Sequence, residues 1–161
     1  MTAHTQRHQD WHARWLSVMR RYLIAATAAH LVWEIAQLPL YTIWDHGQPR
    51  EIAFAVAHCT AGDVLILAST LVLALLLVGA GWPGDDRVYR RVATLAILFA
   101  AGYTIFSEWL NTTVRRSWAY SELMPTLPPL ETGLSPLLQW IVVPVFAFWW
   151  ARRARAGLTS Y

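Results

Sequence analysis

Ionisable and amide side chains recur at helical spacing within the first long apolar stretch of the chain. His30, Glu34, Gln37 and Tyr41 follow one another at intervals of four, three and four residues, which places them on one face of a helix. An ionisable group costs about 2.5–3.5 kcal/mol or more at the centre of a bilayer, so such groups face a bundle interior and mark function. Carboxyl and imidazole groups removed from water suit general acid–base chemistry. This face therefore predicts a polar site inside a membrane.

Each of the other apolar stretches also carries polar residues, and at a rise of about 1.5 Å per residue most of them fall in the outer half of a bilayer. Groups at overlapping depths on four helices are expected to enclose one cavity, because lipid exposure would be costly for each. We expect four residues to be catalytic, namely His30, Glu34, Asp63 and Glu108. We expect the ligand to contact Gln37, Tyr41, His58, Ser107, Asn111, Gln139 and Trp140.

Three uses of this cluster compete. Acid–base chemistry, or stabilisation of a carbocation, would make the protein an enzyme that acts on a lipid. The carboxylates and His58 also suit iron, manganese or zinc, but the spans contain no Glu-x-x-His or His-x-x-x-His pair, and we predict neither a metal nor another cofactor. The third use is a buried hydrogen-bond network between helices, in which each contact contributes about 0.6 kcal/mol.

The elements that position these residues are predicted from hydropathy. Of the 161 residues, 56% are hydrophobic and 14% charged, and about 20 apolar residues suffice to cross a bilayer. The sequence predicts an all-α integral membrane four-helix bundle over residues 22–151, with spans at about 22–44, 52–80, 92–114 and 135–150. Residues 1–21 are predicted to form a cytoplasmic amphipathic segment on the membrane surface, and residues 152–161 a cytoplasmic tail.

The arginines set the expected orientation. All 13 basic residues are Arg; ten flank one end of the predicted bundle, and only Arg50, Arg115 and Arg116 flank the other. By the positive-inside rule both termini are cytoplasmic. The same distribution accounts for the pI of about 9.4 without nucleic acid as a partner. We expect a multi-pass protein of the cell membrane, specifically a bacterial inner membrane; a homo-oligomer is left open.

The longest predicted external connection runs from Arg115 to Gly133. Pro125, Pro128 and Pro129 exclude a continuous helix there. The connection either folds back as a lid or is a connector stiffened by proline.

Two short motifs resemble a known family. The run His30-Leu31-Val32-Trp33-Glu34 is similar to the His-Leu-Val-x-Glu segment of the emopamil-binding protein, a sterol isomerase of the four-span EXPERA group, which includes the sigma-2 receptor. Trp140 with Pro144 resembles the Trp-x-x-x-Pro of that family's last span. The resemblance implies that His30, Glu34 and Trp140 line a hydrophobic pocket that stabilises a cationic amine or a carbocation-like sterol intermediate. Leu137 stands where the family has Asn, and His58 and Asp63 stand in the span where the family has Glu.

The resulting prediction is a cavity that binds an isoprenoid or sterol-like membrane lipid and isomerises it by acid–base chemistry. Glu34 and His30 would protonate a double bond, Asp63 or Glu108 would stabilise the cation or remove a proton, and Trp140 would offer its π-face. The alternatives are a protein that handles a metal or protons in the membrane, and a non-catalytic subunit of a membrane complex.

Overall fold

The computed structural model describes residues 3–156 and is almost entirely helical. Its elements are α1 (Ala3–Gln37), the 3₁₀ helix η1 (Leu38–Leu40), α2 (Ile43–His46), α3 (Pro49–Val78), α4 (Asp86–Trp109), the π-helical turn η2 (Leu110–Val114), the short strands β1 (Thr126–Leu127) and β2 (Thr132–Gly133), and α5 (Leu134–Ala156). Four helices are long and apolar enough to cross a membrane. The predicted all-α, four-span bundle is confirmed.

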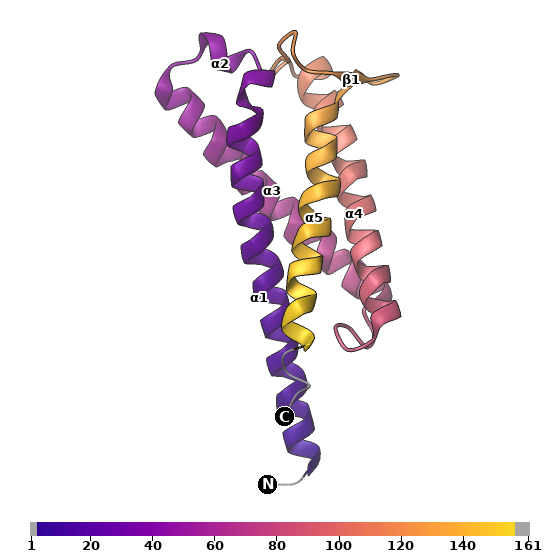
Figure 1. Cartoon of the computed structure of the whole chain (residues 1–161). Helices are drawn as coiled ribbons and strands as arrows, with labels where there is room; N and C mark the ends of the chain where they lie inside the picture. Colours follow the sequence, from indigo (N-terminus) through magenta and orange to yellow (C-terminus); the bar gives the residue numbers. More distant parts are fainter. Residues whose placement is uncertain (1–2, 157–161) are drawn as a thin grey trace.

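The four long helices alternate in direction (Figure 1). Helices α1 and α5 lie side by side along most of α5, α4 lies on the other side of α5, and α3 crosses them obliquely and diverges from the bundle at the end where α2 lies. The start of α1, the end of α5 and the turn between α3 and α4 all lie at the same end. We refer to this as the arginine-rich end, and to the opposite one as the loop end.

The first helix differs most from its predicted bounds. The sequence predicts a span at 22–44 preceded by a separate surface segment, whereas α1 continues unbroken from Ala3 to Gln37. No Gly or Pro interrupts these residues, and the helix ends just before Pro39. Val18 and Tyr22 are fully buried, and Trp15 packs edge-on against Trp82 with ring centroids 5.9 Å apart. Trp15, Val18 and Tyr22 therefore belong to the bundle.

The other helices begin and end where local signals place them. Pro49 opens α3 behind a capping box formed by Gln48 and Glu51, and Gly79 follows its last residue. The carboxylate of Asp85 caps α4 by accepting hydrogen bonds from the backbone N–H groups of Arg87 and Val88. This cap starts α4 several residues before the predicted 92.

The core of the arginine-rich half is apolar. Leu67, Leu71, Val92 and Ala147 are fully buried there, and the Tyr89 hydroxyl donates to the Phe148 carbonyl at 2.7 Å. This packing holds the four helices together below the polar residues.

The connection from Arg115 to Gly133 contains no helix, as its prolines predict; it contains the antiparallel strand pair β1–β2 and an isolated bridge between Tyr41 and Tyr120. It folds back over the end of α1. The Ser121 backbone N–H donates to the Leu40 carbonyl at 2.9 Å, and the Thr42 N–H to the Ala119 carbonyl at 3.0 Å. The Ser121 hydroxyl also donates to the Pro39 carbonyl. The loop is thus attached to the turn after α1 instead of extending away.

Candidate functional site

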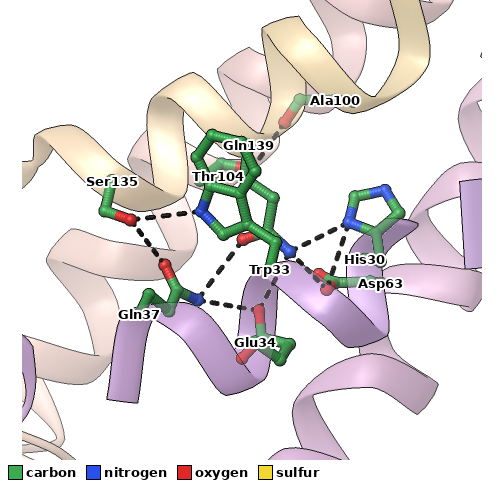
Figure 2. A network of polar contacts seen from close by, with 9 residues as sticks. All are labelled: His30, Trp33, Glu34, Gln37, Asp63, Ala100, Thr104, Ser135 and Gln139. Carbon is green, nitrogen blue, oxygen red and sulfur yellow. Dashed lines mark hydrogen bonds and ion pairs between the residues drawn. The ribbon is translucent and has the colours of Figure 1, made fainter. Parts of the chain in front are cut away.

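The side-chain amide of Gln139 is the centre of a buried polar network (Figure 2). Its nitrogen lies 2.9 Å from His30 Nδ1, 3.0 Å from Glu34 Oε1 and 3.0 Å from Asp63 Oδ2. An amide nitrogen carries only two hydrogens, so it can serve two of these three atoms at a time. His30 Nδ1 also lies 3.4 Å from Asp63 Oδ2, close enough for an ion pair when the imidazole is protonated. Because three acceptor atoms compete for the two N–H groups of Gln139, the network can form more than one set of hydrogen bonds.

The network continues toward the loop end through Gln37. The Gln37 amide donates to Glu34 Oε1 at 2.8 Å, and its oxygen accepts a hydrogen bond from the Ser135 hydroxyl at 2.9 Å. Ser135 in turn accepts from the Trp33 indole N–H at 3.1 Å. Figure 2 shows these contacts crossing from α1 to α5. The Glu34 carboxyl group is thus held between the side-chain amides of Gln37 and Gln139, which fix its orientation.

His30 lies behind the cavity wall. Its side chain is fully buried, its ring packs against Trp140 with centroids 4.6 Å apart, and it is not among the residues that line the cavity. Nε2 finds no hydrogen-bond partner among the described residues. The sequence predicts His30 on the same helix face as Glu34; in the structure its imidazole lies behind the wall, with Nδ1 2.9 Å from Gln139 Nε2 and 3.4 Å from Asp63 Oδ2.

The other predicted site residues meet at one cavity of about 1160 Å³. It is bounded by α1, α3, α4, the first part of α5 and the loop after η2. Its lining includes every other residue predicted for the site: Glu34, Gln37, Tyr41, His58, Asp63, Ser107, Glu108, Asn111, Gln139 and Trp140. Glu34, Asp63, Glu108 and Gln139 are buried. The structure therefore brings residues from all four long helices to a single space.

The cavity opens sideways, toward where lipid would lie. Phe54 and Leu65 of α3 line it while each remains 69% exposed, and Tyr103 of α4 lines it while half exposed. His58 is exposed as well and stacks on Phe54, with centroids 5.5 Å apart. We therefore place His58 at the opening, away from the deep carboxylates. An apolar rim of this kind suits a ligand that enters from the bilayer.

A second acidic group lies at the loop end of the cavity. Tyr120 donates a hydrogen bond from its hydroxyl to Glu108 Oε2 and accepts one from the Gly133 backbone N–H at 2.9 Å. Burial, together with the charge of Glu108, raises the pKa of the Tyr120 phenol above its usual range, so Tyr120 remains a donor at neutral pH. Sequence reasoning missed Tyr120, because it lies in an irregular loop without periodicity.

Helix α4 ends beside Glu108 in the π-helical turn η2. There the Asn111 amide donates to the Ser107 carbonyl at 2.9 Å, and the Thr112 hydroxyl donates to the Glu108 carbonyl at 2.7 Å. Single π turns widen a helix by one residue and are frequent at functional sites. Here Asn111 lies in the π turn and Ser107 and Glu108 lie in α4 just before it, and all three line the cavity.

The chemistry available at the cavity is that of carboxyl groups. Glu34, Asp63 and Glu108 line the interior, while Arg50 and Arg115 line its loop end and are exposed. No group of three or more His, Cys, Asp or Glu side chains within the described part of the chain has a metal-binding arrangement. Buried carboxylates require a proton or a cationic partner to balance their charge. The three carboxyl groups of the cavity can therefore hold protons or balance a positive charge.

Comparison of this chain with protein-family models, with curated proteins and with solved structures finds no match.

Proposed function

We propose that this multi-pass membrane protein binds an isoprenoid or sterol-like lipid in the cavity and moves a double bond within it by acid–base chemistry. One observation carries the proposal: Glu34 of α1 and Asp63 of α3 converge on the same amide nitrogen, each at 3.0 Å, at the wall of a cavity that opens toward lipid. The family resemblance of the His30–Glu34 run supports the same substrate class.

Glu34 and Asp63 are proposed to hold one proton between them, because two adjacent anions in a buried site repel each other. The protonated member adds its proton to one carbon of the double bond, which leaves a carbocation at the other carbon. The ionised member then takes a proton from the neighbouring carbon, and the alkene reforms one position along. The pair ends with one proton, as it began, and the product is an isomer of the substrate.

The residues around the pair serve the same reaction. Gln139 holds both carboxyl groups, and His30 Nδ1 approaches Asp63 from behind the wall. The Trp140 ring borders the cavity, where its π-face would stabilise positive charge by about 0.5–2 kcal/mol. Glu108, held by Tyr120, supplies negative charge at the loop end.

The core below the site favours this proposal over proton conduction. The buried residues between the network and the arginine-rich end are mainly apolar, as Leu67, Leu71 and Ala74 show. A proton path across the bundle would need polar groups or water at this level. The polar residues instead line a cavity next to this apolar layer, an arrangement that suits an enzyme or a binding protein.

The test is isomerisation in heavy water. Purified protein in detergent is incubated in D₂O with a panel of sterols and polyprenols that carry one defined double bond, and the products are analysed by mass spectrometry. The proposal requires an isomer that carries one deuterium from the wild type and none from Glu34→Gln or Asp63→Asn. Tight lipid binding without deuterium uptake would instead indicate a binding protein, and stoichiometric metal would indicate the metal alternative.

A further inference from the structure

A second hollow, of about 660 Å³, lies between α1 and α5 on a different face of α1 from the site. Its floor is made of small side chains, including Ala25, Ala28 and Ala29, and its walls include Trp150 at the arginine-rich end and Trp33 toward the loop end. Small residues on one helix leave an open groove unless a neighbour fills it. Within the described chain, this groove is unfilled.

One charged residue, Arg21, lines the groove at the arginine-rich end. Nearby arginines of α5 are engaged: Arg152 pairs with Asp86 at 3.3 Å, and the Arg153 guanidinium lies 3.7 Å from the centre of the Trp149 ring. No carboxylate among the side chains described in residues 11–153 forms an ion pair with Arg21. An unpaired cation at the end of an apolar groove is complementary to an anion that carries an apolar chain.

We propose that the groove binds an anionic phospholipid, with its phosphate at Arg21 and an acyl chain along α1 toward Trp33. The twelve residues between these positions correspond to about 18 Å of helix, close to the roughly 15 Å that one leaflet contributes to the hydrocarbon core. A second copy of this chain fits the groove less well. A two-fold contact through the same face would bring the two Arg21 side chains to the same end of the interface, where they would repel.

The proposed lipid reaches the wall of the functional site without entering the cavity. Trp33 borders the groove and donates to Ser135, which donates to Gln37. The bound chain would therefore pack against the outermost member of the network that holds Glu34. The inference does not depend on the proposed isomerisation, because its ligand, site and test are separate.

The test is native mass spectrometry of the full chain in detergent, titrated with phosphatidylglycerol or phosphatidylcholine of identical acyl chains. The wild type should bind phosphatidylglycerol more tightly. Arg21→Gln should weaken phosphatidylglycerol binding about fivefold, the usual contribution of one arginine near the membrane surface. Phosphatidylcholine binding should weaken less, because the choline cation of that lipid offsets the charge of its phosphate. Ala28→Leu, which fills the groove, should weaken binding of both lipids.

Arg14→Gln is the matched control, because Arg14 is exposed on the same helix and does not line the groove. Its lipid binding should equal that of the wild type, and circular dichroism should show unchanged helix content in all variants. Equal losses for Arg14→Gln and Arg21→Gln would indicate general charge attraction and overturn the proposal. Equal affinity of the wild type for the two lipids, or a dimer that Ala28→Leu abolishes, would overturn it as well.

Discussion

Among the carboxyl groups of the site, Glu34 is the one held by two side-chain amides. Its Oε1 accepts from Gln37 at 2.8 Å and lies 3.0 Å from Gln139 Nε2, so its position is fixed from both sides while it remains at the cavity wall. Positioned acid–base groups typically contribute a factor of about 10²–10⁴ to a rate. A substitution that removes only the ionisation of Glu34 should therefore change the reaction rate without changing the packing around the side chain.

Glu34→Gln keeps the size and most hydrogen bonds of the side chain but removes its ionisation. We expect the variant to insert and fold normally, with isomerisation reduced at least a hundredfold and with weaker binding of a tertiary-amine lipid mimic. The measurement is amine affinity against pH for both proteins. Leu40→Ala, off the polar face, should behave as the wild type. Superimposable wild-type and Glu34→Gln curves would remove Glu34 as the partner of a cation.

The contribution of the Tyr120 hydroxyl to the stability of the loop 115–133 can also be tested. Tyr120→Phe removes the donor to Glu108 and the acceptor of the Gly133 N–H, and each lost hydrogen bond of this kind costs about 1 kcal/mol. We expect a lower thermal midpoint and faster proteolysis of the loop 115–133. Tyr103→Phe is the control, because Tyr103 is half exposed at the cavity opening. An unchanged midpoint in Tyr120→Phe would show that the Glu108 contact does not hold the loop.

At the scale of elements, the packing of the loop end depends on the close approach of the Tyr120 side chain to Gly133. A Cβ atom at Gly133 would lie 3.0 Å from the Tyr120 ring and hydroxyl, whereas a Cβ at Gly102 of α4 meets nothing within 4 Å. Gly133→Ala should therefore displace Tyr120 and destabilise the fold by about 1–3 kcal/mol, as overpacking does. Gly102→Ala should be neutral or stabilise α4 by up to about 1 kcal/mol. Equal unfolding midpoints for the two variants would contradict this packing.

The sequence predicted the helices better than the contacts between them. Three spans agree to within a few residues, apart from the early start of α4 and the late end of α5. The agreement follows from local signals, namely hydropathy, the start of α3 at Pro49 and its end before Gly79. The continuity of α1 was not predicted, since an amphipathic stretch is compatible with a surface helix as well as with a bundle. Tyr120 and the burial of His30 depend on residues about a hundred positions away or on loop geometry, which periodicity does not encode.

At the scale of the whole molecule, the alternating helices place three arginine-bearing segments at one end. The first part of α1, the start of α4 with the turn before it, and the end of α5 lie together (Figure 1), and ten of the 13 arginines belong to them. The loop end carries Arg50, Arg115 and Arg116. Since arginine-rich ends stay in the cytoplasm, the cavity near the loop end is expected in the outer half of the bilayer.

This orientation is tested by reporter fusions at three positions. Fusions after Gly84 and after Tyr161 should report the cytoplasm, and an insertion near Thr126 in the β1–β2 hairpin should report the external side. The decisive variant changes only the difference in positive charge between the two ends of the bundle. Replacing Arg87, Arg90 and Arg91 by Gln removes the cluster at the α3–α4 turn, and because short loops near span ends set orientation, a mixed topology should then appear. Charge-to-Gln changes at Arg50, Arg115 and Arg116 should instead leave a single topology. A cytoplasmic signal near Thr126 in the wild type would show that the orientation is the reverse of the expected one and that the cavity opens in the inner leaflet.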